Sequence, residues 1–183
     1  MISVGFGKLK PDSYLPSIYH IDYYKLHENG IKYAIFDVDC TIVPFDSIKV
    51  DDDLNTLFRY IKILGINSAL FSSNFNSRVK PVADKLGINY GYLKAKPFAS
   101  FSEIQKLFDA DCCPYNTAYI GDSFFFDMIQ ADNLHVYKIL VDMIRDGNGL
   151  KLQANDFLQM IMCNTIVSPD FKAKSYYRGY LER

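Results

Sequence analysis

Residues 35–44 read I-F-D-V-D-C-T-I-V-P, and this stretch decides the fold. The apolar run from Tyr33 to Phe36 leads directly into two carboxylates, Asp37 and Asp39, which stand two residues apart. A short uninterrupted run of aromatic and β-branched residues predicts a buried β-strand. Charges at the end of a buried strand are costly unless something compensates them, and a divalent cation would do so. Alone, the stretch fits equally well a strand that runs into an acidic turn.

The pair of carboxylates suggests a definite chemistry. One of them would act as a nucleophile and the other as a general acid, with a hard cation between them and a phosphate. Asp37 and Asp39 therefore become the first candidate catalytic residues.

Strands and helices alternate along the chain after this stretch, which predicts an α/β fold with a central, parallel, doubly wound sheet. Further strands are predicted from apolar runs at 66–71, 88–93, 117–120 and 135–141. In such sheets the ligand crevice lies at the carboxyl ends of the strands. Ser73, Lys96 and Asp122 each follow a predicted strand, so the fold would gather them beside Asp37.

Two polar segments are interpreted as helix starts. Asp51–Asp53 precede apolar residues at helical spacing, and acidic residues in a first turn are favoured by the helix dipole. A metal site is the alternative interpretation of this acidic run. Ser100 and Glu103 have the spacing of a capping box before another helix. A further helix is predicted through Leu86, starting or kinking at Pro81.

Composition suits one domain spanning residues 1–183, with a core of ordinary size. Within it we distinguish an aromatic N-terminal leader, 1–31, expected on the outside of the core, and a divergent C-terminal helical segment, 143–183. The formal net charge of −1 gives no support to nucleic-acid binding.

Cysteine usage and hydropathy indicate a cytoplasmic protein. Its four cysteines form no C-x-x-C pair, which suggests a reducing compartment. The sequence lacks the apolar region of a signal peptide and any run long enough for a membrane span. We therefore expect a cytoplasmic protein, soluble or peripheral at the inner membrane face.

D-V-D-C-T at 37–41 resembles the D-x-D-x-T motif of the haloacid-dehalogenase (HAD) superfamily of phosphotransferases. The rest of that machinery follows in order, with S-S-N at 72–74, K-A-K-P at 94–97 and G-D at 121–122, each after its own predicted strand. The resemblance implies a three-layer Rossmann-like fold. It also implies that Asp37 attacks phosphorus to form an aspartyl-phosphate, and that Asp39 serves as general acid and then as base.

The same resemblance assigns the remaining site residues. Asp122 would ligate Mg²⁺ together with Asp37 and the backbone carbonyl of Asp39, with Asp127 as a further ligand or a supporting residue. Lys96 would neutralise charge shared by the nucleophile and the phosphate. The residues expected to bind the substrate phosphate are Thr41, Ser73, Asn74 and Lys96.

The spacing of these motifs resembles that of capless HAD enzymes (type IIIA). Asp37 and Ser73 are 36 positions apart, and Ser73 and Lys96 are 23 apart, which leaves no room for an inserted cap domain. A site without its own lid admits a large substrate or is covered by a neighbouring subunit, so oligomerisation is one expectation.

A narrower resemblance is to the YqeG-type HAD phosphatases, over about residues 8–142. It rests on L-K-P-D-S-Y at 9–14, S-N-F-N-S-R-V at 73–79, G-D-S-F-F-F-D at 121–127 and the terminal R-G-Y-L-E-R. This group is related to the phosphatidylglycerophosphatases of cardiolipin synthesis. The resemblance therefore implies phosphatidylglycerophosphate as substrate, bound by its headgroup at a membrane surface. Cys40 stands where the group commonly has Asn.

Two alternatives stay open at this point. One is a capless phosphatase of a soluble sugar phosphate or nucleotide, whose lid comes from oligomerisation. The other is a catalytically silent HAD domain that serves as a binding module. The second is disfavoured because Asp37, Asp39, Lys96 and Asp122 are all present.

Overall fold

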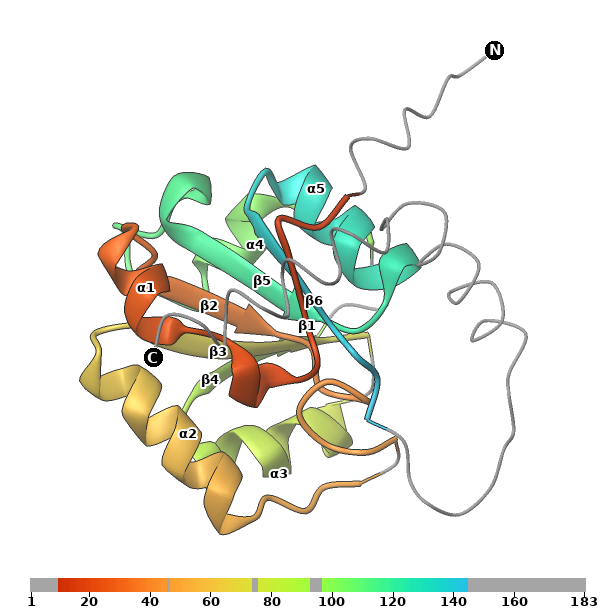
Figure 1. Cartoon of the computed structure of the whole chain (residues 1–183). Helices are drawn as coiled ribbons and strands as arrows, with labels where there is room; N and C mark the ends of the chain where they lie inside the picture. Colours follow the sequence, from red (N-terminus) through yellow and green to blue (C-terminus); the bar gives the residue numbers. More distant parts are fainter. Residues whose placement is uncertain (1–9, 46, 74–75, 93–96, 145–183) are drawn as a thin grey trace.

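The computed structural model describes residues 10–45, 47–73, 76–92 and 97–144. In this part of the chain six strands form one fully parallel sheet in the order β1-β6-β5-β2-β3-β4 (Figure 1). The strands are β1 (Ser13–Leu15), β2 (Tyr33–Phe36), β3 (Asn67–Ser72), β4 (Asn89–Tyr92), β5 (Thr117–Gly121) and β6 (Tyr137–Val141). The α/β prediction is confirmed, and β2 to β6 agree with the predicted strands to within two residues.

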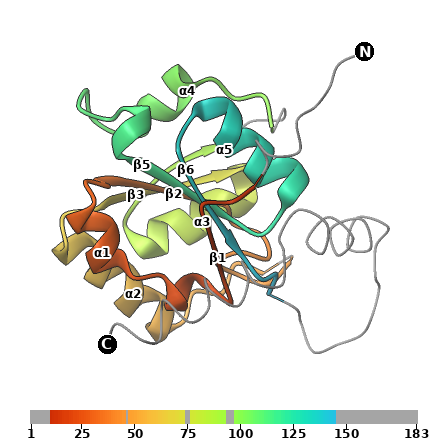
Figure 2. The same cartoon turned by 45° about the horizontal axis from the view of Figure 1, so that its top comes forward.

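Helices cover both faces of the sheet, which gives the three layers seen when Figures 1 and 2 are compared. The helices are α1 (Tyr23–Glu28), α2 (Asp52–Ile63), α3 (Asn76–Leu86), α4 (Phe101–Gln105) and α5 (Ile129–Leu134), with short turns η2 (Ile18–His20), η3 (Pro114–Asn116) and η4 (Phe124–Met128). One core joins α1, α2 and α3 to alternate strand residues such as Phe36 and Leu70. A second core joins α4 and α5 to the residues between them, such as Ile35 and Tyr119.

The predicted helix starts are confirmed. Asp51 caps α2, because its carboxylate accepts a hydrogen bond of 2.9 Å from the amide of Leu54. Before α4, the amide of Ser100 donates to Glu103 Oε2 at 2.8 Å, as a capping box requires. The acidic run at Asp51–Asp53 is thus a helix start, and α3 contains Pro81 rather than beginning there.

The N-terminal leader differs from the sequence expectation. It supplies the edge strand β1, which pairs with β6 from Ser13 to Leu15, and it buries Tyr14, Ile18 and Tyr23 in the protein. The expectation that the leader lies outside the core is therefore wrong. The strand β1 was not predicted because three residues, one of them polar, are too few to show the alternating pattern of a strand. The helices predicted at 155–164 and from Ser168 lie outside the described residues.

Candidate active site at the carboxyl ends of β2 and β5

The site lies at the point of the sheet where the order of strand addition reverses. From the central strand β2 the chain adds β3 and β4 on one side, and then β5 and β6 on the other. Phe36 and Ile120 are partners in the two central strands, and the amide of Asp37 donates to the carbonyl of Ile120 at 2.9 Å. Residues that follow β2 and β5 therefore emerge side by side, at the position where open α/β sheets bind ligands.

Three carboxylates meet there. Asp37, Asp122 and Asp127 each offer an oxygen, and these oxygens all lie within 4.8 Å of one another. All three residues are largely buried. Burial, together with the neighbouring carboxylates of Asp127 and Asp37, raises the pKa of Asp122 well above its ordinary value. The cluster thus has an electrostatic penalty that a cation would remove.

The donors fit Mg²⁺ in kind and lie close to the spacing that it needs. Magnesium takes oxygen ligands at about 2.1 Å, so oxygens on opposite sides of the ion lie about 4.2 Å apart. The three carboxylates approach that spacing, and the hydroxyl of Thr41 holds one of them by donating to Asp122 Oδ1 at 2.8 Å. Asp37, Asp122 and Asp127 are therefore the residues that would hold the ion.

Thr41 has a contact that sequence analysis did not predict, while its contact with the substrate phosphate stays a prediction. Its side chain is buried, and its hydroxyl contacts a carboxylate of the cation cluster. The loop after Asp37 is a tight turn, so Thr41, four positions after Asp37, lies close enough to the end of β5 to contact Asp122. Within it, the amide of Cys40 donates to the carbonyl of Val43 at 2.8 Å, and Cys40 has a φ of +63°.

Cys40 is not a competing nucleophile. Burial and the nearby carboxylates of Asp122, Asp39 and Asp37 raise the pKa of its thiol to about 12. The thiolate is the reactive form of cysteine, so the Cys40 side chain is inert near neutral pH.

Asp127 reaches the cluster because of a local helix irregularity. The chain after β5 makes a π-helical turn, η4, in which the amide of Met128 donates to the carbonyl of Ser123 at 3.0 Å. The turn points the carboxylate of Asp127 back toward the strand end, where Oδ2 accepts from the amide of Ser123 at 3.0 Å. That carboxylate lies against Gly121, and a Cβ on Gly121 would overlap it. The sequence motif contains this glycine, but the need for a residue without a side chain at position 121 becomes clear only from the structure.

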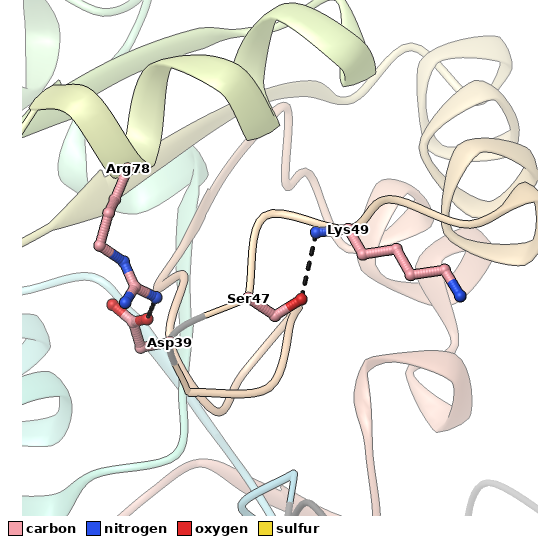
Figure 3. Close-up of polar contacts among 4 residues, drawn as sticks. All are labelled: Asp39, Ser47, Lys49 and Arg78. Atoms are coloured by element: carbon pink, nitrogen blue, oxygen red, sulfur yellow. Dashed lines mark hydrogen bonds and ion pairs between the residues drawn. The ribbon is translucent and has the colours of Figure 1, made fainter.

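Asp39, the predicted acid and base, is paired with a residue to which sequence analysis gave no role. Arg78, on the first turn of α3, donates from Nη2 to Asp39 Oδ1 (Figure 3). Its only signal in the sequence was membership of the S-N-F-N-S-R-V stretch at 73–79.

The predicted phosphate-binding residues are described only in part. β3 ends in two hydroxyls, with Ser72 buried and Ser73 exposed just beyond the strand. Ser73 thus lies at the carboxyl edge of the sheet, as predicted, and Ser72 is a second hydroxyl at the same strand end. Asn74 and Lys96 lie outside the described residues.

Comparison with known proteins identifies the family. No family model matches the sequence. The chain is 30% identical over 149 residues to the protein named probable phosphatase YqeG of Bacillus subtilis strain 168, and the match covers 79% of this chain and 84% of that protein. The chain belongs to the YqeG family. The resemblance to HAD phosphatases is thereby confirmed, and with it the enzyme class of the family, phosphoric monoester hydrolases.

Three solved structures align with this YqeG-family chain over most of its length. A protein assigned to HAD subfamily III A from Legionella pneumophila aligns with a TM-score of 0.48 and 18% identity, covering 90% of this chain and 97% of that one. A 3-deoxy-D-manno-octulosonate 8-phosphate phosphatase from Moraxella catarrhalis, in complex with magnesium, phosphate and KDO, aligns with a TM-score of 0.43 and 16% identity, covering 87% and 95%. The cobalt-bound phosphatase of the same kind from Haemophilus influenzae has a TM-score of 0.45 and 20% identity, covering 86% and 99%.

The capless architecture of this YqeG-family member is visible in its element order. Among the described residues, α2 is the one helix between β2 and β3, and α3 is the one helix between β3 and β4. The two intervals in which HAD enzymes carry caps thus hold no inserted domain. No helix in the described ranges combines the length and apolar character needed to span a membrane.

Proposed function

We propose that this protein is a Mg²⁺-dependent phosphomonoester hydrolase that works through an aspartyl-phosphate on Asp37. The observation that supports it best is the close approach of Asp37 to Asp122 and Asp127 at the switch point of the sheet, with Asp39 two residues further on. We take the whole chain, 1–183, as one HAD-like domain for this function.

In the proposed reaction an oxygen of Asp37 forms a bond to phosphorus as the bond to the leaving oxygen breaks. Asp39 gives that oxygen its proton. Asp39 then takes a proton from the water that attacks phosphorus, which releases inorganic phosphate and restores the Asp37 carboxylate. Bound Mg²⁺ would neutralise charge on the phosphoryl oxygens.

The remaining residues of the proposal bind rather than react. Ser73 and Asn74 donate hydrogen bonds to the phosphoryl oxygens, and Lys96 neutralises their charge. Thr41 steadies Asp122 through the hydrogen bond described above. Besides Asp37, Asp122 and Asp127, the backbone carbonyl of Asp39 would be a further ligand to the ion.

The chemistry is tested by replacing the nucleophile. Asp37→Asn keeps the size of the side chain and removes its charge, so phosphate release should fall by at least about a thousandfold, because the covalent step is lost. EDTA should abolish wild-type activity and Mg²⁺ should restore it. Full activity of a folded Asp37→Asn protein would refute the aspartyl-phosphate route.

For the substrate we propose the headgroup of a phosphatidylglycerophosphate-like lipid, hydrolysed at the cytoplasmic face of a membrane. Supporting it are apolar side chains exposed on segments that follow β4 and β5, whose carboxyl ends lie at the same edge of the parallel sheet as the site. Phe98 is 75% exposed and Phe126 46% exposed. Exposed aromatic side chains of this kind suit contact with an apolar phase.

The alternative is a soluble sugar phosphate or nucleotide, for which a second copy of the chain would supply the lid. Phosphate release from phosphatidylglycerophosphate in mixed micelles, beside a panel of soluble esters, separates the two. The double variant Phe98→Ser, Phe126→Ser should raise KM for the micellar lipid and leave soluble esters unaffected. The matched control is Tyr115→Ser, an exposed aromatic before β5 at the opposite edge. Activity on soluble esters alone, with a stable oligomer by gel filtration, would favour the alternative.

A further inference from the structure

The contact between Arg78 and Asp39 joins two distant parts of the chain at the candidate active site. Arg78 lies on the first turn of α3 and Asp39 on the loop that follows β2, 39 positions earlier. The two side chains are largely enclosed, with 20% of Arg78 and 14% of Asp39 exposed. A bond from a charged donor to a charged acceptor is among the stronger hydrogen bonds, and partial enclosure limits its screening by solvent.

A third side chain holds the guanidinium in place. The carbon at the centre of the Arg78 guanidinium lies 5.6 Å from the centroid of the Phe45 ring. A guanidinium over an aromatic face is attracted by the negative charge of the ring's π-system. Because Phe45 belongs to the same loop as Asp39, that loop contacts Arg78 at two points.

Among the described residues, two lysines of the same region, Lys49 and Lys80, differ from Arg78 in their contacts. In Figure 3 the side chain of Lys49 runs away from the Arg78–Asp39 pair, and its amide donates to Ser47 Oγ at 3.1 Å. On α3 itself, Lys80 pairs with Asp84 at 2.6 Å, but those side chains are 53% and 58% exposed. An exposed pair of that kind contributes little. Position and enclosure therefore distinguish Arg78 from an ordinary surface cation.

The backbone around Asp39 is held by its own hydrogen bonds, so the contact of Arg78 acts on the orientation of the Asp39 side chain. The hydrogen bonds of the tight loop and the bridge between Asp39 and Val43 hold the main chain. A carboxylate can still rotate about its own side-chain torsions. The bond from Arg78 to Asp39 Oδ1 limits that rotation.

We propose that Arg78 is a positioning residue for the reaction and is itself steadied by Phe45. It orients the carboxyl group of Asp39, whose Oδ1 accepts from Arg78 while the other oxygen carries the proton that passes to the leaving oxygen. This inference rests on the proposed function, because it needs Asp39 as the acid. Arg78 touches no reacting atom in this account and acts only through Asp39.

The test is the dependence of kcat/KM on the leaving group, because kcat/KM reports the steps up to transfer of phosphorus to Asp37. An aryl ester such as p-nitrophenyl phosphate needs little protonation as it leaves, whereas an alkyl ester such as glycerol phosphate needs a positioned acid. General acid catalysis contributes about 10²- to 10⁴-fold, so Arg78→Met should lower kcat/KM for the alkyl ester at least about tenfold more than for the aryl ester. Arg78→Lys, which keeps the charge, should recover part of the difference.

A double-variant cycle supplies the second readout. If Arg78 acts through Asp39, then Arg78→Met should cost less than about twofold in a protein that already carries Asp39→Asn. Lys80→Met, the matched control on the same helix, should behave as wild type. Thermal melting with and without Mg²⁺ checks that each variant is folded and still binds the ion.

Equal losses on both esters in folded Arg78→Met, or losses that add to those of Asp39→Asn, would overturn the proposal. A wild-type protein that hydrolyses no phosphomonoester, or an Asp37→Asn protein with full activity, would instead refute the proposed function. An active wild type, an inactive Asp37→Asn and an unaffected Arg78→Met would refute the positioning role alone.

Discussion

At the scale of single residues, the cation cluster is a source of instability in the metal-free protein. Asp122 is buried beside two other carboxylates, so its pKa in the folded protein exceeds the value of about 3.9 in the unfolded chain. The folded state then binds the proton more tightly than the unfolded state. Stability contributed by this group is present below that unfolded value and is lost as pH rises toward the folded pKa.

Asp122→Asn tests this account directly. The amide removes one charge and still offers an oxygen to the hydroxyl of Thr41. In EDTA near neutral pH the variant should melt at a higher temperature than wild type. As pH rises above about 4, the variant should also lose less stability than wild type does. Mg²⁺ should raise the melting temperature of wild type much more than that of the variant. A variant less stable than wild type in EDTA would contradict the repulsion argument.

The three carboxylates were predicted from their motifs because each follows its strand by a short, fixed interval. Arg78 was not assigned a role, because its contact with Asp39 spans 39 positions and depends on how α3 approaches the loop after β2. The contact of Thr41 with Asp122 was not predicted, because a sequence motif gives neighbours along the chain and not the direction of a hydroxyl. Sequence therefore predicted which strand ends carry chemistry, and the structure adds which side chains meet.

At the scale of elements, the turn η4 can pack against the end of β5 because Gly121 has no side chain. Gly121→Ala would place a methyl group on the carboxylate of Asp127. The side chain of Asp127 must then move away from Asp37 and Asp122, so the affinity for Mg²⁺ should fall by about tenfold to a hundredfold. Titration of the melting temperature with Mg²⁺ measures the change.

Gly91→Ala is the control for crowding alone. In β4 a Cβ on Gly91 would lie 3.1 Å from Leu107 and 3.2 Å from Phe71, away from the carboxylates. It should destabilise the protein by about 1–3 kcal/mol with unchanged Mg²⁺ affinity. Equal Mg²⁺ affinity in the two glycine variants would show that Gly121 has no special relation to the ion.

At the scale of the whole molecule, the N-terminal leader belongs to the sheet. Tyr14 is buried in β1, and its hydroxyl donates to Asp142 just beyond β6. Tyr14→Ala should therefore destabilise the protein by about 3 kcal/mol or more, as large-to-small core substitutions do. Tyr14→Phe, which removes only the hydrogen bond, should cost about 1 kcal/mol. Urea unfolding measures both, and an unchanged Tyr14→Ala midpoint would return the leader to the outside of the core.

The overall layering was predictable, whereas the edge of the sheet was not. Uninterrupted apolar runs such as the one before Asp37 specify central strands, since both faces of those strands are covered. The edge strand β1 is short, and its partner β6 begins more than 120 positions later, so no local pattern indicates the pairing. Such long-range pairing is visible only in three dimensions.

The strand order has a consequence for synthesis. The central strand β2 is made early, yet its neighbour β5 and the cation residues Asp122 and Asp127 are made late, and β1 waits for β6. While the chain is still being translated, one side of its most apolar strand stays open, which is a state prone to aggregation. The carboxylates of the cluster come together only after β5 has docked. We therefore expect a prematurely terminated chain that lacks β5 to be inactive, and loading of the cation to follow closure of the sheet.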